Sequence, residues 1–162
     1  PPMPLDPVAL AHDLCAIDST SGQEGAVVAW LERRLAADGW QVRRIPVTPG
    51  RDDLFAEGAR PAEVVLSTHL DTVPPFVPPR LEEERLYGRG SCDAKGIAAA
   101  MVCAAARLRE RGVPVGLLFV VGEETTHDGA HAANAAQPTL APQVRALNAG
   151  APTESALGSG TK

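Results

Sequence analysis

The sequence has 162 residues, which suits one domain, and its composition of 44% hydrophobic but only 4% aromatic residues predicts a core of mostly Ala, Val and Leu. The formal net charge of −5, without a basic cluster, argues against binding to nucleic acid or to an anionic membrane. No apolar run approaches the ~20 residues of a membrane span, the amino terminus lacks a signal-like segment, and three cysteines without metal-finger spacing fit a reducing compartment, so we expect a cytoplasmic protein.

The first half of the sequence alternates between helical and extended patterns. Ser21 and Glu24 match a capping box, which predicts that they close the start of the second helix. The segments expected, in chain order, are a helix over 5–17, a helix that ends near 38, a strand over 40–47, a polar loop or tight hairpin over 48–62 and a strand over 63–68.

The second half continues this alternation. Its expected segments are a surface loop over 74–84, a Gly-rich loop over 86–96, an Ala-rich helix over 97–111, a nearly wholly apolar strand over 115–121, a helix over 125–136, a weak strand over 145–148 and a turn over 150–155. Alternating helices and strands predict an α/β sandwich with a largely parallel sheet. In such sheets, functional residues gather at the carboxyl ends of the strands.

A histidine and an aspartate, His69 and Asp71, follow the strand over 63–68. Residues two apart on an extended chain point the same way. His69 could therefore bind a metal through one ring nitrogen while Asp71 holds the ring in one tautomer. Taken alone, the pair also fits an ordinary polar turn.

Carboxylates occupy two further sites of this kind. Asp93 lies in the Gly-rich loop, where a helix N-cap is the alternative role, and Glu123 and Glu124 follow the apolar strand. Two adjacent carboxylates at such a place are costly unless a positive group meets them. Histidine and carboxylates suit zinc, and two metals ~3.5–4 Å apart can polarise a carbonyl and activate water. A free carboxylate could then move the proton to the leaving amine.

Together these motifs resemble the di-zinc metallopeptidase and amidohydrolase family of acetylornithine deacetylase, succinyl-diaminopimelate desuccinylase, carboxypeptidase G and aminoacylase-1. The matching segments are Thr-His-Leu-Asp-Thr-Val-Pro at 68–74, Tyr-Gly-Arg-Gly-Ser-Cys-Asp-Ala-Lys-Gly at 87–96 and Val-Gly-Glu-Glu at 121–124. The resemblance implies a three-layer α/β/α sandwich with a mostly parallel sheet. Residues 1–162 would form the amino-terminal portion of its catalytic domain, without the inserted dimerisation domain and the last catalytic strands of a homodimeric parent.

The resemblance also implies a role for each site residue. His69 would bind one zinc and be oriented by Asp71, Asp93 would bridge two zincs, and Co²⁺ could replace Zn²⁺. The bond between Asp93 and the next residue would be a cis peptide. Glu123 would be the general base and then the general acid, and Glu124 would bind the second zinc. The implied reaction is hydrolysis of an amide or peptide bond in a small N-acyl amino acid or short peptide, by metal-activated water.

The sequence departs from the family pattern in two ways. Ala151 occupies the place of an acidic ligand in the turn over 150–155, and the late histidine that binds the second zinc in the family has no counterpart before residue 162. The alternative function is therefore a catalytically incomplete or inactive remnant that keeps the fold. His127 and His131, four residues apart on a predicted helix, could form a metal pair but also fit a polar helix face.

Overall fold

The computed structural model describes residues 5–152 of the chain. In chain order its elements are α1 (Pro7–Cys15), α2 (Gly25–Ala37), β1 (Gln41–Thr48), β2 (Arg51–Glu57), β3 (Val64–His69), β4 (Arg80–Glu82), β5 (Arg85–Tyr87), α3 (Lys95–Glu110), β6 (Val115–Val120), α4 (Asp128–Leu140) and β7 (Ala146–Ala149). Among these described residues, none of the helices has the length and apolar character needed to cross a bilayer.

A five-stranded sheet in the order β1-β2-β6-β3-β7 forms the centre of the molecule. The pairs β1–β2 and β2–β6 are antiparallel, whereas β6–β3 and β3–β7 are parallel. The predicted α/β class is confirmed, and the sheet is mixed. Its parallel half contains the strands whose carboxyl ends carry the candidate site.

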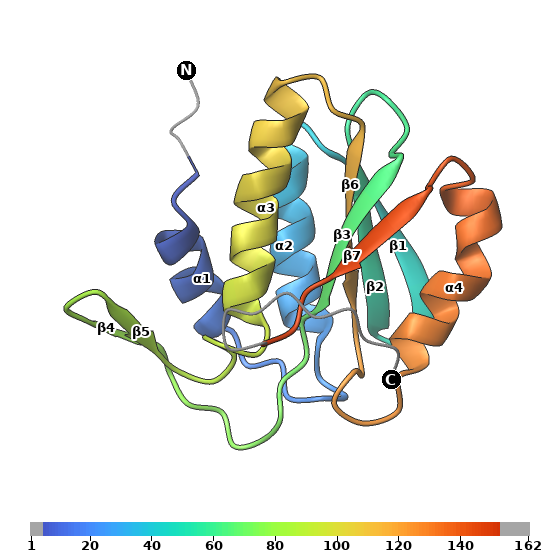
Figure 1. The fold of residues 1–162 in the computed structure, drawn as a ribbon. Helices are drawn as coiled ribbons and strands as arrows, with labels where there is room; N and C mark the ends of the chain where they lie inside the picture. The colour runs from blue at the N-terminus through green and yellow to red at the C-terminus, as the bar shows by residue number, and fades with distance from the viewer. Residues whose placement is uncertain (1–4, 153–162) are drawn as a thin grey trace.

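Helices cover both faces of this sheet, as the predicted three-layer sandwich requires. Helices α1, α2 and α3 lie on one side and α4 lies on the other (Figure 1). The chain passes from β3 to β6 through α3 and then returns past β3 to β7 through α4. Because such crossovers are right-handed, the two opposite directions place α3 and α4 on opposite faces.

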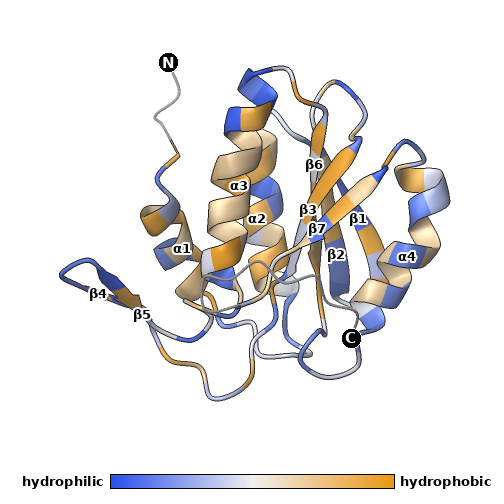
Figure 2. Ribbon diagram, in the orientation of Figure 1, coloured by the Kyte–Doolittle hydropathy of each residue, from blue (hydrophilic) through white to orange (hydrophobic). Residues whose placement is uncertain are grey.

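The core is divided between these two faces. Strand β6 is hydrophobic over most of its length (Figure 2), and Leu117 and Phe119 are fully buried against the helices on the α3 side. Val65 and Ala133 belong to a smaller cluster on the α4 side. The Ala-rich sequence of α3 gives it small buried side chains, which allow close packing on the sheet as predicted.

Strand β2 covers part of the segment expected to be a polar loop or a tight hairpin. It pairs with β1 through a turn after Thr48, so the hairpin alternative is correct. The first residues of β2, Arg51, Asp52 and Asp53, are charged, which concealed the strand in the sequence. Arg51 and Asp52 pair with charged groups of neighbouring segments, and Asp53 Oδ1 accepts the Val121 N–H while burial raises the pKa of that carboxyl to about 7.

Two local predictions need correction. The predicted capping box does not form, because the Glu24 side chain makes no cap bond at the start of α2 and Ser21 donates instead to Asp71. The surface loop over 74–84 contains β4, which pairs with β5 in a separate two-stranded sheet that projects from the body (Figure 1).

Candidate metal centre

The predicted site residues meet at the carboxyl ends of β3 and β6. His69 is the last residue of β3, and Glu123 and Glu124 lie in the turn that follows β6. These strands are adjacent and parallel, with His69 paired to Val120, so the residues that follow them reach the same edge of the sheet. Asp93 arrives from the loop before α3.

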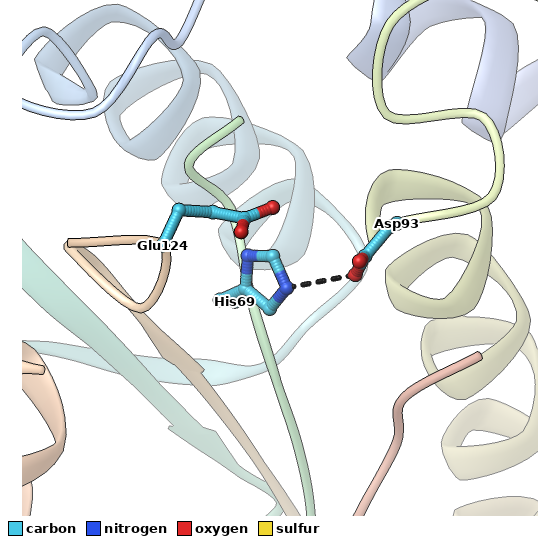
Figure 3. Close-up of side chains that lie close together, drawn as sticks. All are labelled: His69, Asp93 and Glu124. Carbon is cyan, nitrogen blue, oxygen red and sulfur yellow. Dashed lines mark hydrogen bonds and ion pairs between the residues drawn. The ribbon is translucent and has the colours of Figure 1, made fainter. Parts of the chain in front are cut away.

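Three of these side chains converge closely enough to share a metal ion. In His69, Asp93 and Glu124, one potential ligand atom of each lies within 4.8 Å of the others (Figure 3). His69 Nε2 is 3.0 Å from Asp93 Oδ1 and 3.8 Å from Glu123 Oε2. Within residues 5–152, no other group of three or more such residues meets this condition. Neither exposed His127 nor exposed His131 joins the cluster.

Asp71 makes the contacts that hold His69, Glu123 and Glu124 in place. Its side chain is fully buried, with Oδ1 accepting the backbone N–H of Glu123 at 3.0 Å and Oδ2 accepting that of Glu124 at 3.1 Å. Ser21 Oγ also donates to Oδ2, at 2.7 Å. The His69 Nδ1 atom lies 3.0 Å from the backbone oxygen of Asp71 and 3.4 Å from Oδ1. Asp71 therefore orients the imidazole and also holds the turn that carries both glutamates.

The electrostatics of the cluster favour a bound positive charge. Burial opposes protonation of His69, but Asp71, then Asp93 and Glu123, outweigh it and raise the pKa of His69 to about 9. Burial likewise opposes ionisation of Asp71, but its hydrogen bonds lower the pKa of that carboxyl to about 2. Burial and then the charge of Asp93 raise the pKa of Glu124. A cation among these groups would relieve the repulsion between the carboxylates.

The donor set fits a metal of the zinc type. One imidazole and two carboxylates are ligands that zinc accepts, and a catalytic zinc site needs three protein ligands with a further position open. The Asp93–Ala94 peptide bond is cis, as the resemblance implies. The Asp93 and Glu123 side chains are 48% and 43% exposed, so a small molecule can reach them.

A cleft of about 750 Å³ opens beside the cluster, between the sheet and α4. Ala151 lines this cleft together with His69. The preceding Gly150 is fixed to β3, since its N–H donates to the Ser67 carbonyl and its carbonyl accepts from Thr68 Oγ1. Ala151 thus reaches the site as the resemblance implies, but its side chain is a methyl group, which cannot bind metal. Glu154, a nearby carboxylate in the sequence, lies outside the described residues.

The structure brings together the five predicted site residues, His69, Asp71, Asp93, Glu123 and Glu124, but the sequence patterns did not indicate the residues that support them. The residues missed are Ser21, Glu24, Arg51 and Asp128, which bind one another or Asp71 across long sequence separations. The sequence signal for two of them was the capping-box spacing of Ser21 and Glu24, and the fold shows that both side chains bind other elements instead.

The fold and the cluster define an α/β protein with a candidate metal centre at the carboxyl ends of its parallel strands. Residues 65–159 match the model of the peptidase family M20/M25/M40, and the chain belongs to this family. A probable carboxypeptidase from Aspergillus clavatus is 38% identical over an alignment of 171 positions, and this alignment covers 93% of this chain and 37% of that relative. This chain therefore spans less than half the length of that curated relative.

Solved structures share the fold at lower identity. Human carnosine dipeptidase 1 superimposes with a TM-score of 0.74 at 19% identity, over 90% of this chain and 38% of that one. A dinuclear metal-binding peptidase of the M20 family from Bacillus subtilis gives a TM-score of 0.65 at 19% identity, over 88% and 41% of the two chains. At these identities the likeness extends to the fold alone.

Proposed function

We propose that this chain is the amino-terminal portion of the catalytic domain of a metal-dependent hydrolase, which cleaves an amide or peptide bond in an N-acyl amino acid or short peptide. The observation that carries the proposal is the convergence of His69, Asp93 and Glu124, with Glu123 beside them in an open cleft. Membership of the M20 family and the probable carboxypeptidases among its relatives support a peptidase.

His69, Asp93 and Glu124 are the residues of this chain that would hold zinc. Bound zinc would polarise the substrate carbonyl and lower the pKa of water. Asp71 keeps the His69 ring oriented through contacts with Nδ1, which leaves Nε2 directed towards Asp93. The two glutamates, whose N–H groups both bind Asp71, keep a fixed spacing relative to His69.

Glu123 is the residue proposed to move the proton. Its carboxylate lies 3.8 Å from His69 Nε2, outside the group of three ligand atoms, and it is part of the cleft lining. It can therefore accept a proton from the attacking water and return it to the departing amine. A carboxylate beside a metal site, rather than bound to it, is suited to this exchange.

The second candidate function is a remnant that keeps the fold without turnover, and Ala151 is the observation that favours it. Metal content and hydrolysis separate the two functions. We would measure the zinc bound per chain and the hydrolysis of N-acetyl amino acids and dipeptides, using this chain and a complete protein that contains it. Two zincs with turnover in the complete protein support the hydrolase, whereas no tight metal and no turnover support the remnant.

Substituting Ala151→Glu is expected to strengthen zinc binding by this chain. The new carboxylate would arise from a turn already fixed to β3 by Gly150 and would enter the cleft that Ala151 lines. We expect a gain of at least ~10-fold, the lower end of what metal sites lose when a supporting group is removed. Isothermal titration with Zn²⁺ measures it.

Two variants control for this effect. Ala151→Gln has the same length without the charge and is expected to give a much smaller gain. Leu147→Glu adds a carboxylate on β7, at an exposed position in the lining of the same cleft, and tests whether negative charge in the cleft is enough to attract zinc. Equal gains from Ala151→Glu and Leu147→Glu would contradict a ligand position at residue 151.

A further inference from the structure

Arg51, at the start of β2, joins two elements that flank the candidate site. Its Nε and Nη2 atoms donate to the two carboxylate oxygens of Glu24, at 2.9 and 3.0 Å. Its Nη1 donates to Asp128 Oδ2 at 2.8 Å. Glu24 immediately precedes α2 and Asp128 begins α4, so one guanidinium connects helices on opposite faces of the sheet.

These contacts are largely removed from solvent. The Glu24 side chain is fully buried and that of Arg51 is 15% exposed. The bond with Glu24, then that with Asp128, raises the pKa of Arg51. Arginine binds carboxylates through paired N–H groups with a fixed geometry, which makes such a bridge directional as well as strong.

The Arg51–Asp128 ion pair packs directly against the turn that carries Glu123 and Glu124. Gly122 opens this turn with φ +69, and its carbonyl accepts the N–H of His127 at 2.8 Å. A side chain at Gly122 would overlap both Asp128 Oδ1 and Arg51 Nη2, because the pair lies against the turn backbone. The backbone of the turn therefore packs against the Arg51–Asp128 ion pair, with no room for a side chain between them.

The turn from 122 to 127 therefore has two anchors. On one side, Asp71 accepts the N–H groups of Glu123 and Glu124. On the other side, Asp128 is held through Arg51. Both anchors are bound by the short segment over 21–24, because Ser21 donates to Asp71 and Glu24 accepts from Arg51.

From this geometry we infer that Arg51 is a positioning residue for Glu123 and Glu124, acting through Asp128 on the turn between β6 and α4. The inference rests on the proposed function, because it assigns the residue to the proposed metal centre. Nothing in the bridge contacts the His69 cluster directly. A merely structural ion pair would instead stabilise the fold without affecting the geometry of the site.

Arg51→Met is expected to weaken Zn²⁺ binding to this chain by ~10-fold or more, as loss of a supporting group does in metal sites. It should also speed hydrogen exchange of the backbone amides over 122–127, measured by mass spectrometry. Arg44→Met is the matched control. Arg44 also joins α2 to β2, through Glu32 and Asp52, but has no bond to the turn. The control should change neither measurement.

Two further variants separate positioning from folding. Arg51→Met alone leaves the buried Glu24 charge unpaired and should therefore lower the Tm. Combining it with Glu24→Gln removes that charge, so the double variant should recover part of this loss in Tm. Arg51→Lys keeps the charge and the fold but loses the paired bonds. If positioning is correct, zinc affinity stays low in the double variant and is intermediate in Arg51→Lys. Recovery of affinity in parallel with Tm would overturn the inference.

Hydrogen exchange keeps this inference separate from the proposed function. If the unaltered chain binds no Zn²⁺, the proposed function fails for this chain, but the exchange rates over 122–127 still decide the role of Arg51. Faster exchange confined to this turn in Arg51→Met supports positioning. Unchanged exchange there, or equal acceleration over the whole chain, overturns it.

Discussion

Glu123→Gln is expected to lower kcat of a complete protein containing this chain by about 10²–10⁴-fold, the contribution typical of a general acid–base residue. The amide cannot accept the proton of the attacking water, although it has nearly the same size as the carboxylate. Metal content should stay unchanged, because the group of ligand atoms is formed by His69, Asp93 and Glu124. Steady-state kinetics on an N-acyl amino acid or dipeptide, with zinc per chain measured on the same sample, test both statements.

The neighbouring Glu124→Gln is the matched comparison, since it makes the same chemical change one residue further along the turn. It should reduce zinc content first, with activity falling as a consequence and partly restored by excess Zn²⁺. An undiminished kcat in Glu123→Gln would refute the proton-transfer role. If both variants lose zinc equally, the division of roles between the two glutamates is wrong.

The residues of the cluster could be predicted because each lies in a short motif beside a strongly patterned element. His69 ends β3 and Asp71 follows that strand closely, whereas Glu123 and Glu124 follow the apolar strand β6. Carboxyl ends of adjacent parallel strands meet at one edge, so sequence order was enough to place them together. Asp93 lies in a Gly-rich loop and not after a strand, so its loop-end position grouped it with them, and the family resemblance then implied its metal-binding role.

The residues that support the cluster could not be predicted, because they are brought together from distant parts of the sequence and not by a short motif. Arg51 binds Glu24 and Asp128, which are 27 and 77 residues away in the sequence, and no local pattern links them. The charges of Arg51, Asp52 and Asp53 made β2 resemble a polar loop. Ser21 and Glu24 have the spacing of a capping box, and tertiary bonds to Asp71 and Arg51 replace that local arrangement.

Asp71→Asn is expected to weaken zinc binding by ~10–100-fold, the loss seen when a group that supports a metal ligand is changed. Asp71 Oδ1 accepts from the Glu123 N–H, while Oδ2 accepts from the Glu124 N–H and Ser21 Oγ. An asparagine has only one carboxamide oxygen, so its NH₂ must face one of these backbone donors in either orientation. One glutamate therefore loses its anchor, and the His69 ring loses a carboxylate neighbour.

The same change should lower the free energy of unfolding by about 1–3 kcal/mol, because it leaves a buried donor without an acceptor. Urea unfolding and Zn²⁺ titration on one preparation measure the two effects. Ser21→Ala is the control, since it removes one bond to Asp71 but leaves both backbone bonds intact; it should cost about 1 kcal/mol and little zinc affinity. If Ser21→Ala weakens zinc binding as much as Asp71→Asn, the two backbone bonds are not what positions the glutamates.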